Sequence, residues 1–388
     1  MKTKILSIFF VWCMVLGIFL VPVSAADASD VLETSGSLDL DCISAILMDQ
    51  ATGTVLYEQN ADEALPPASV TKVMTLLLVM EAIDEGKIRL DDMVSASAHA
   101  ASMGGSQVYL KEGEQMSVEE LVKSVVIASA NDAALALAEY VAGSEAAFVE
   151  GMNKRAEALG MKNTHFENTN GLDDTVENHV TSARDIAIMS AALIEHDTIL
   201  KYSGIWMDTV RNGAFGLTNT NRLVRFYKGA TGLKTGSTAK AKFCVSATAK
   251  REGMHLICVI MGAETRDIRN AEATKLLDYG FANYELFCAE GKALSEIKVV
   301  GGVENSCGIA YESFDCVVKK GEKGSVKGEV LLDDSVSAPV SKGTEVGKVV
   351  YRLGSDVVGE TAIYTTEQIG KIGFLDILCR LFAGVLLK

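Results

Sequence analysis

The stretch Pro66–Leu78, "PPASVTKVMTLLL", places a serine and a lysine three residues apart at the start of an apolar run. The run continues to about Ile83 and predicts a buried helix, because it is too short to span a membrane. Residues three apart share one face of a helix, so the Ser69 hydroxyl and the Lys72 amine can meet. Desolvation beside apolar side chains lowers the pKa of a lysine. Lys72 could therefore take the proton of a serine nucleophile at position 69.

The same pair also has a structural interpretation. Ser69 could cap the start of the helix while Lys72 extends its charged head to water. Because Ser-x-x-Lys is a common spacing, the pair alone does not separate these two interpretations. The choice depends on which other polar motifs the chain carries.

A second polar motif, Ser129-Ala130-Asn131, lies in a small-residue stretch between two predicted helical segments. Ser129 could relay a proton from Lys72. The Asn131 amide offers both a donor and an acceptor to a peptide-like substrate. By itself, the motif is also compatible with a plain loop or a helix kink.

A third motif, Lys234-Thr235-Gly236, opens a predicted strand. On an edge strand, a glycine lets the backbone of a substrate lie alongside as a further strand. Lys234 supplies positive charge, and the N–H of Ser237 could complete an oxyanion site with that of Ser69. The structural alternative is a surface lysine before a turn.

Hydrophobic patterning gives the fold class. Two apolar runs flank Ala51–Gly53 and predict a β-hairpin. Ser117, followed by Glu120, predicts a capping box and a helical segment to about Tyr140. Two β-rich runs flank a turn at Arg251–Gly253, and strands at both ends with helices between them predict an antiparallel sheet with a helical part, an α/β (α+β) fold. Further helices are predicted at about 145–160, 181–196 and 269–287.

The chain has 388 residues, more than the size at which single cores usually stop growing. Between about 290 and 363, short alternating segments separated by glycines predict a small β-sandwich. The predicted organisation is a signal peptide at 1–25, a linker at 26–37, a catalytic domain at 38–287, the β-sandwich domain at 290–363 and an amphipathic helix at 366–388.

The N-terminus has the pattern of a targeting segment. Lys2 and Lys4 precede an apolar run at Ile5–Val21, and Val23–Ala25 fits a small-x-small cleavage site. A retained transmembrane helix is the alternative. Either interpretation places the remaining chain outside the cytoplasm, at the outer face of the cytoplasmic membrane on the cell-wall side.

The C-terminal stretch 373–388, "GFLDILCRLFAGVLLK", keeps one apolar face at helical period, with Asp376 and Arg380 on the other side. It is too short and too charged to span a bilayer comfortably. An anchor helix that lies in the plane of the membrane surface is therefore predicted. A helix docked on the protein's own β domain is the alternative.

Charge and cysteine content exclude some functions. The formal net charge of -15 argues against a nucleic-acid partner, because no basic stripe compensates for it. Of eight cysteines, Cys13 leaves with the signal peptide, and the odd remainder fits poorly with a full disulfide framework. Most are interpreted as small core residues, with a Cys307–Cys316 bridge as an alternative. No Cys/His spacing suggests a metal site, and no cofactor is expected.

The three motifs occur in the order Ser-x-x-Lys, Ser-x-Asn, Lys-Thr-Gly, a known signature of class A β-lactamases and penicillin-binding proteins. Residues 38–287 resemble the low-molecular-weight penicillin-binding D-alanyl-D-alanine carboxypeptidases. The segments that carry the resemblance are "MDQATGTVLYEQN", "NTNGLDD", "TSARDIA" and "TGLKTGSTAKAKFC". The resemblance implies a β-lactamase/transpeptidase-like domain, and the trailing β domain and amphipathic tail match that family's layout.

By this resemblance, the chain is a serine-type carboxypeptidase acting in peptidoglycan biosynthesis, cell wall biogenesis and cell shape. Its substrate is a peptidoglycan stem peptide ending in D-Ala-D-Ala. The terminal D-alanine leaves, water hydrolyses the acyl-enzyme, and β-lactams act as covalent inhibitors. The implied catalytic residues are Ser69 as nucleophile, Lys72 as proton acceptor and Ser129 as relay; the implied substrate-binding residues are Asn131, Lys234, Thr235, Gly236, Ser237 and Arg269. Arg266 is an alternative to Arg269 for the terminal carboxylate.

Two other functions remain open from the sequence. A class A-like β-lactamase would carry a Glu-x-x-Leu-Asn loop, in which the glutamate and the asparagine are four residues apart. In Glu167–Asn170 the glutamate and the asparagine are only three apart. Glu167 is therefore interpreted as a surface residue. A non-catalytic penicillin-binding wall protein is the second alternative, and the intact motif residues argue against it.

Overall fold

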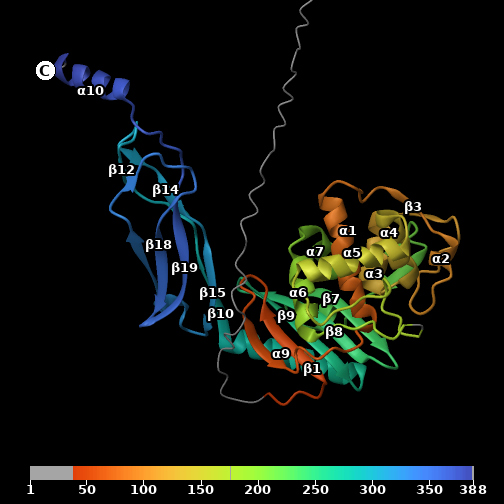
Figure 1. The fold of residues 1–388 in the computed structure, drawn as a ribbon. Coiled ribbons are helices and arrows are strands. Elements are labelled where there is room, and N and C mark those ends of the chain that lie inside the picture. The colour runs from red at the N-terminus through yellow and green to blue at the C-terminus, as the bar shows by residue number, and fades with distance from the viewer. Residues whose placement is uncertain (1–37, 175, 387–388) are drawn as a thin grey trace, which may run out of the picture. The chain divides into compact units, whose positions relative to one another are not determined.

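The computed structural model describes residues 38–174 and 176–386 (Figure 1). The predicted signal peptide at 1–25 and linker at 26–37 lie outside the described residues. Where they fall in described regions, the predicted hairpins and helices can be compared with the structure one by one.

A five-stranded antiparallel sheet in the order β2-β1-β9-β8-β7 forms the centre of the N-terminal region. Its strands are β1 (Ser44–Asp49), β2 (Val55–Gln59), β7 (Ala230–Thr238), β8 (Lys242–Arg251) and β9 (Met254–Ala263). The hairpin predicted around Ala51–Gly53 is confirmed, with Gly53 at a positive φ of 69° in the turn. The turn at Arg251–Gly253 is also confirmed. The Lys-Thr-Gly motif lies on the edge strand β7, as predicted, but it does not open the strand, which begins four residues earlier at Ala230.

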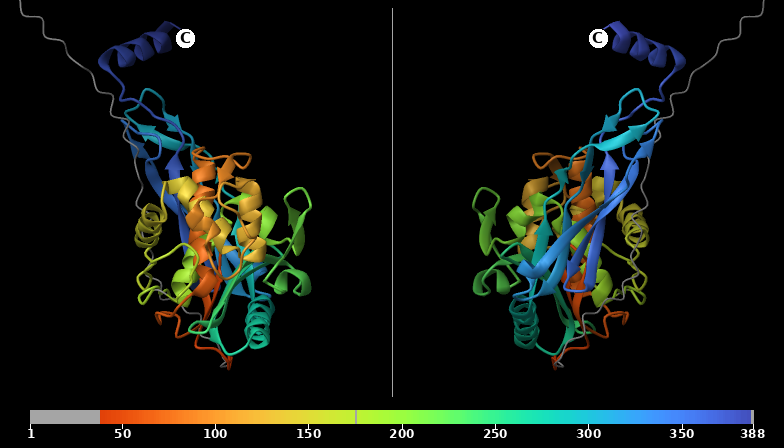
Figure 2. Two further views of the ribbon diagram at one scale, coloured as in Figure 1. Left: turned by 90° about the vertical axis from the view of Figure 1, so that its right-hand side faces the viewer. Right: turned by 90° about the vertical axis from the view of Figure 1, so that its left-hand side faces the viewer.

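Alternate residues of the strands enter two separate apolar cores. In β1, Ala45 and Leu47 belong to one core, whereas Ile46 and Met48 belong to the other. In Figures 1 and 2, α9 covers one face of this sheet, and α1 and α6 lie on the opposite side. Both faces are therefore buried, which explains the continuously apolar sequence of β9. The helices on the sheet are α1 (Lys72–Asp84), α6 (Ala183–Ile194) and α9 (Arg266–Asn283).

The helical part completes the core that contains Ile46. The helix that follows Ser117 begins with the predicted capping chemistry, since Ser117 Oγ accepts the Glu120 N–H at 3.2 Å. The helices predicted at 145–160 and 181–196 are confirmed as α5 and α6. The remaining elements of this region are the 3-10 turn η1 (Ala68–Thr71), β3 (Met93–Ser95), α2 (Ala98–Ala101), β4 (Gln115–Ser117), α3 (Val118–Ala128), α4 (Asn131–Ala142), α5 (Glu145–Ala158), α7 (Asp197–Ser203), β5 (Met207–Val210), β6 (Phe215–Thr218) and α8 (Leu223–Phe226).

The C-terminal region is built from short strands around a third apolar core, as the alternating pattern predicted. A five-stranded sheet has the order β11-β14-β19-β18-β16, and a three-stranded sheet has the order β13-β12-β17. β10 pairs with β15. The strands are β10 (Tyr284–Ala289), β11 (Lys292–Ala293), β12 (Ile297–Val300), β13 (Ser306–Cys307), β14 (Ile309–Tyr311), β15 (Phe314–Lys319), β16 (Val326–Leu332), β17 (Val336–Ser337), β18 (Glu345–Leu353) and β19 (Asp356–Thr365), with a 3-10 turn η2 at Lys323–Ser325.

The tail helix α10 (Phe374–Leu386) does not begin at 366 as predicted, because residues 369 and 371 form bridges to Val340 and Gly302 and the Ile369 side chain is buried. A Cys307–Cys316 bridge is absent, since the seven cysteines in the described part of the chain are all free. Among the helices that the structure describes, none combines the length and apolar character needed to cross a bilayer.

Candidate active site

Ser69 and Lys72 meet at the entry to α1. Lys72 Nζ lies 2.8 Å from Ser69 Oγ and donates a hydrogen bond to the carbonyl oxygen of Asn170, also at 2.8 Å. Ser69 lies on the 3-10 turn η1 and α1 begins at Lys72, so the serine precedes the α-helix rather than lying on it. The three-residue spacing still works, since a 3-10 turn brings residues i and i+3 into line.

The structural interpretation of this pair is wrong. Neither η1 nor α1 has a side-chain cap, so Ser69 does not act as one. Lys72 does not extend to water either, because its side chain is fully buried. Burial lowers the pKa of Lys72 well below its ordinary value, and the positive charge of Lys234 lowers it further. The amine is therefore suited to accept a proton.

Lys234 and Ser129 form a second pair. Lys234 Nζ donates to Ser129 Oγ at 2.8 Å and to the carbonyl oxygen of Thr235 at 2.9 Å. The interpretation of Lys234 as a surface lysine is wrong, since only 1% of it is exposed. Burial, and then the charge of Arg269, lowers the pKa of Lys234 to about 7. Ser129 ends α3 at a positive φ of 63°, a conformation in which non-glycine residues are uncommon.

Asn131 lies at the start of α4 and has one unused polar atom. Its Nδ2 donates to the carbonyl oxygen of Gly104 at 2.7 Å, and its backbone N–H donates to that of Ser106, also at 2.7 Å. Its Oδ1 is buried and has no hydrogen-bond partner among the described residues. Buried acceptors are normally paired, so this oxygen still lacks a donor, although Asn131 is not among the residues that line the cavity.

β7 approaches the serine very closely. A Cβ at Gly236 would lie 2.8 Å from the Ser69 nitrogen and 2.8 Å from the Pro67 carbonyl oxygen, so only glycine fits. Thr235 Oγ1 donates to Thr220 Oγ1 at 2.8 Å, which ties β7 to the loop after β6. Ser237 follows on the strand and is exposed.

These groups surround a cavity of about 670 Å³. Six of the predicted site residues line it: Ser69, Ser129, Thr235, Gly236, Ser237 and Arg269. The structure thus brings together motifs from η1, the α3–α4 junction and β7. Lys72 and Lys234 lie behind the cavity wall, each bonded to a serine that lines the cavity.

The cationic side of the cavity has more than one arginine. Arg269 is buried, its Nη2 donates to Asn270 Oδ1 at 2.8 Å, and burial with the charge of Arg266 lowers its pKa to about 10. Arg266 and Arg222 are exposed and also line the cavity. Arg269 and its predicted alternative Arg266 therefore both reach the site, and Arg222 was not anticipated.

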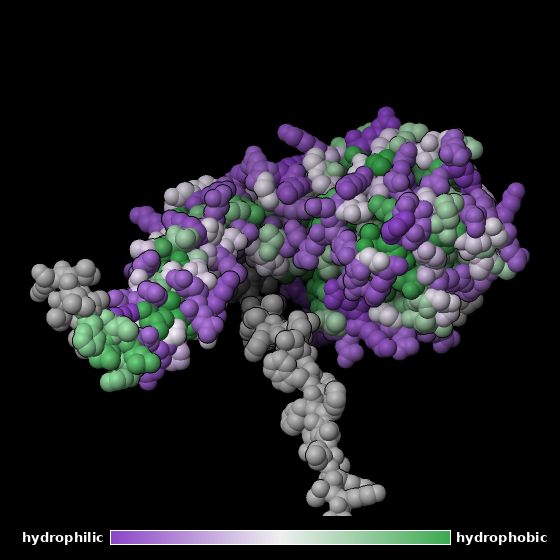
Figure 3. Space-filling view, turned by 90° about the horizontal axis from the view of Figure 1, so that it is seen from above, coloured by the Kyte–Doolittle hydropathy of each residue, from purple (hydrophilic) through white to green (hydrophobic). Residues whose placement is uncertain are grey.

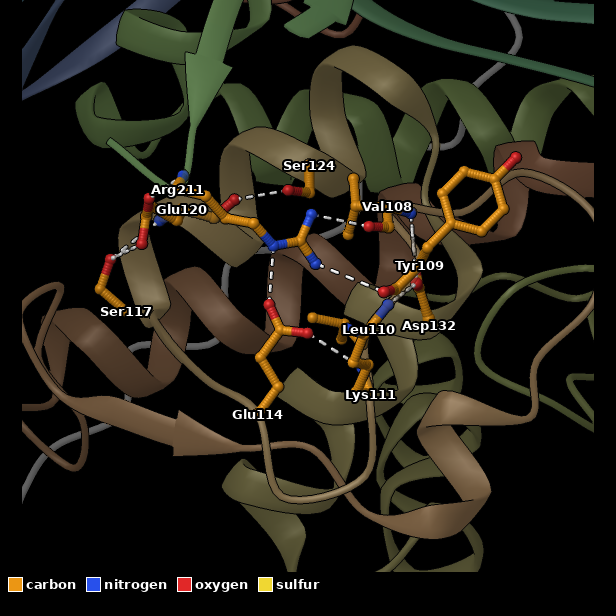
Figure 4. A network of polar contacts seen from close by, with 10 residues as sticks. All are labelled: Val108, Tyr109, Leu110, Lys111, Glu114, Ser117, Glu120, Ser124, Asp132 and Arg211. Carbon is orange, nitrogen blue, oxygen red and sulfur yellow. Dashed lines mark hydrogen bonds and ion pairs between the residues drawn. The ribbon is translucent and has the colours of Figure 1, made fainter. Parts of the chain in front are cut away.

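Sequence reasoning also missed the support of Asn131. The next residue, Asp132, is buried, and its carboxylate accepts the N–H groups of Val108 at 3.2 Å and Leu110 at 2.9 Å (Figure 4). An aspartate inside the apolar stretch "NDAALALA" was a usable signal, because a buried carboxylate needs hydrogen-bond donors.

Arg211 holds the same loop from its other side. It pairs with Glu114 at 2.7 Å, and its Nη1 donates to the carbonyl oxygen of Val108 at 2.8 Å (Figure 4). Its backbone N–H donates to Glu120 at 2.7 Å. The loop next to Asn131 is thus fixed through its N–H groups by Asp132 and through a carbonyl by Arg211. Nothing in the sequence around Arg211 signals this role.

The comparisons with known proteins agree with this geometry. The sequence profile described as D-alanyl-D-alanine carboxypeptidase matches residues 31–265, and that of the penicillin-binding protein 5 C-terminal domain matches 283–371. The chain is 44% identical to D-alanyl-D-alanine carboxypeptidase DacF of Bacillus subtilis, over 87% of this chain and 88% of that protein. It is 35% identical to DacC of Escherichia coli, over 88% of each chain. The crystal structure of penicillin-binding protein 5 from Haemophilus influenzae matches with a TM-score of 0.78 and 34% identity, over 87% of this chain and 100% of that one.

Fold and site define a serine enzyme of the penicillin-binding class, with a catalytic domain and a C-terminal β domain. The chain belongs to the D-alanyl-D-alanine carboxypeptidase family, as the sequence motifs predicted. It is a serine-type D-Ala-D-Ala carboxypeptidase, a hydrolase.

Glu167 is exposed, and its carboxylate accepts the Asn178 N–H at 2.9 Å, in line with its interpretation as a surface residue.

Proposed function

We propose that Ser69 is the nucleophile that removes the terminal D-alanine from peptidoglycan stem peptides, with Lys72 as its base. The observation that carries this proposal is the 2.8 Å separation of Ser69 Oγ from the nitrogen of a fully buried lysine. A neutral amine has two N–H groups and one lone pair. One N–H group bonds to the Asn170 carbonyl, and the lone pair accepts the Ser69 hydroxyl proton.

In the acylation step, Ser69 Oγ attacks the carbonyl carbon of the penultimate D-alanine. An ester bond forms, the amide bond breaks, and the leaving nitrogen takes a proton. The proton that Lys72 took from Ser69 passes to the leaving nitrogen through Ser129, whose hydroxyl is held in place by a hydrogen bond from Lys234 Nζ at 2.8 Å. Water then hydrolyses the ester and frees the serine.

Binding and charge stabilisation follow from the cavity walls. The backbone N–H groups of Ser69 and Ser237 stabilise the oxyanion, and the close approach of Gly236 to the Ser69 nitrogen supports this. The free Oδ1 of Asn131 accepts an N–H of the stem peptide. The terminal carboxylate binds on the side of Lys234, Thr235 and Arg269, with Arg266 within reach of the same cavity.

A β-lactam acylates Ser69 in the same way and leaves slowly. A related protein, penicillin-binding protein D2 of Listeria monocytogenes, has been crystallised in an ampicillin-bound form and is 33% identical over 63% of this chain. The proposed role is in peptidoglycan biosynthesis, and with it in cell wall biogenesis and cell shape.

The test is D-alanine release from diacetyl-Lys-D-Ala-D-Ala, with and without penicillin, together with labelling by a fluorescent penicillin. Ser69→Ala should abolish release and labelling while thermal unfolding stays unchanged, because the side chain of Ser69 caps nothing. Labelling that survives in Ser69→Ala would show that the nucleophile is another residue. Rapid penicillin turnover without D-alanine release would favour a β-lactamase, and an unlabelled wild type would favour a non-catalytic protein.

We further propose that the chain is exported and that α10 lies in the membrane surface on the cell-wall side. Phe374, Leu375 and Phe382 are 77%, 71% and 59% exposed, and Figure 3 shows apolar residues gathered at this end of the chain. An amphipathic helix with such side chains in water lowers its free energy when it enters a membrane surface, because the apolar side chains leave the water. Arg380 of α10 donates to Asn305 Oδ1 at 3.3 Å and to the Val303 carbonyl oxygen, so the contact with the β domain is polar and leaves these apolar side chains exposed.

A further inference from the structure

A buried histidine lies behind the nucleophile and has no part in the mechanism above. His179 is 4% exposed and packs against the ring of Phe166. Its Nε2 lies 2.7 Å from Thr71 Oγ1, and its Nδ1 accepts the backbone N–H of Glu167 at 2.9 Å. Thr71 directly precedes Lys72, does not line the cavity and is fully buried.

The protons of this cluster can be assigned. The Thr71 hydroxyl donates to the carbonyl oxygen of Ala68 at 2.8 Å, and a hydroxyl has only one proton. Thr71 Oγ1 must therefore accept from His179, which requires a proton on Nε2. Nδ1 must be unprotonated, because it accepts from Glu167. A neutral imidazole satisfies both ends, and burial favours it by lowering the pKa of His179 to about 4.

One end of this chain of hydrogen bonds fixes the backbone just before the nucleophile. Ala68 has a φ of 47°, in the left-handed region that non-glycine residues rarely adopt. Such a conformation persists only where the surroundings hold it in place. Its carbonyl group is bonded by Thr71 and packed tightly by Gly171, where a Cβ would lie 1.8 Å from the Ala68 oxygen.

The other end fixes the segment that supports the base. Glu167 begins the stretch that leads to Asn170, whose carbonyl oxygen accepts from Lys72 Nζ. Thr75 of α1 holds the same stretch by donating to the carbonyl oxygen of Thr169 at 2.6 Å. His179 thus connects the backbone next to Ser69 with the segment that bonds to Lys72.

We propose that His179 is a positioning residue for the reaction, acting through Thr71 to set the geometry between the Ser69 hydroxyl and the Lys72 amine. This inference rests on the proposed roles of Ser69 and Lys72. It assigns no proton transfer to His179, whose contribution is a fixed pair of hydrogen bonds. Loss of those bonds should slow the chemical step while leaving the cavity able to bind its ligand.

The test uses the full chain and a fluorescent penicillin, with the acylation rate constant and the dissociation constant of the initial complex measured separately. His179→Leu keeps an apolar side chain in the site and removes both hydrogen bonds. It should slow acylation by about 10- to 100-fold. The dissociation constant should change by less than about threefold, as expected when ground-state binding is intact. His179→Gln, which retains a donor toward Thr71, should recover part of the lost rate.

Thr71 gives an independent matched pair. Thr71→Val replaces the hydroxyl with a methyl group and should slow acylation as His179→Leu does, whereas Thr71→Ser keeps the hydroxyl and most of the rate. The double variant His179→Leu/Thr71→Val should be no slower than the slower single variant, because both substitutions break the same hydrogen bond between His179 and Thr71. This pair decides the question if His179→Leu does not fold.

His255→Leu is the control for removing a buried histidine. His255 is 6% exposed, its Nε2 lies 2.9 Å from Thr231 Oγ1, and burial lowers its pKa to about 4 as well. Equal slowing in His255→Leu and His179→Leu would overturn the proposal, and so would wild-type acylation in Thr71→Val. A wild type that is never acylated would instead contradict the proposed function itself.

Discussion

Two buried amines lie in one site. The hydrogen-bond partners of Lys72 and Lys234 among the described residues are hydroxyl and carbonyl oxygens, so neither lysine forms an ion pair. A buried ammonium group without a counter-charge is costly, and a protein avoids that cost when the group gives up its proton. The two lysines are therefore partly neutral in the folded protein. Protonation of either amine lowers the stability of the fold.

This cost predicts a pH dependence of stability. The pKa of Lys234 is about 7 in the folded state and 10.5 ordinarily, so between these values the unfolded chain binds more protons. The free energy of unfolding should then rise with pH from about 7 to 10, by about 1 kcal/mol per pH unit from this group. Urea unfolding of wild type and Lys234→Met at pH 7.5 and 9 measures it. The stability of wild type relative to Lys234→Met should increase with pH, and an unchanged difference would contradict the lowered pKa.

Individual elements bring the motifs together through their ends and edges. Ser69 lies on the turn before α1, Ser129 and Asn131 lie where α3 gives way to α4, and Lys234 lies on the edge strand β7. At helix ends and sheet edges, some backbone N–H and C=O groups have no partner within the helix or sheet and can bind other groups. The hairpin β5–β6 adds an indirect element, since Arg211 at its turn holds the loop that orients Asn131 (Figure 4).

Arg211→Lys should weaken substrate binding more than it slows the chemical step. Lysine cannot bond to Glu114 and the Val108 carbonyl in the fork geometry of arginine, so the loop beside Asn131 becomes less ordered. We expect the KM for diacetyl-Lys-D-Ala-D-Ala to rise by about 3- to 10-fold with a smaller change in kcat.

Arg155→Lys is the matched control. Arg155 pairs with Glu81 at the same 2.7 Å, in a similarly half-buried setting away from the cavity. The Arg155→Lys variant should lose about as much thermal stability as Arg211→Lys but keep the kinetic constants of the wild type. Identical kinetics in Arg211→Lys and wild type would show that the loop does not depend on this arginine.

At the scale of the whole molecule, the proposed chemistry lies in one region of the chain and the proposed membrane attachment in another. The proposed catalytic and substrate-binding residues all lie between η1 and α9, in the region built around a sheet with both faces covered. The β domain has its own apolar core, and α10 carries exposed apolar side chains at the end of the chain. Activity on a small peptide and membrane attachment should therefore be separable.

Deletion of residues 373–388 tests this separation. The shortened chain should lose binding to anionic phospholipid vesicles and keep D-alanine release from soluble peptide within about twofold, because α10 contributes nothing to the cavity. Sedimentation with vesicles and the peptide assay measure the two properties. Undiminished vesicle binding would assign attachment to another part of the protein, and lost activity would mean that α10 supports the catalytic domain.

The sequence by itself determined the features that depend on local chemistry. Capping at Ser117, the turn at Gly53 and the three motifs in their order predicted the elements, the family and several residues that line the cavity, because each pattern reflects neighbours a few residues apart. Only the tertiary structure decided which distant groups meet. The Asn170 carbonyl behind Lys72, the pairing of Lys234 with Ser129 and the reach of Arg211 depend on packing between segments far apart in the chain, which no local pattern encodes. The start of α10 at Phe374 differs from prediction for the same reason, since the bridges of residues 369 and 371 to distant segments keep the preceding residues out of the helix.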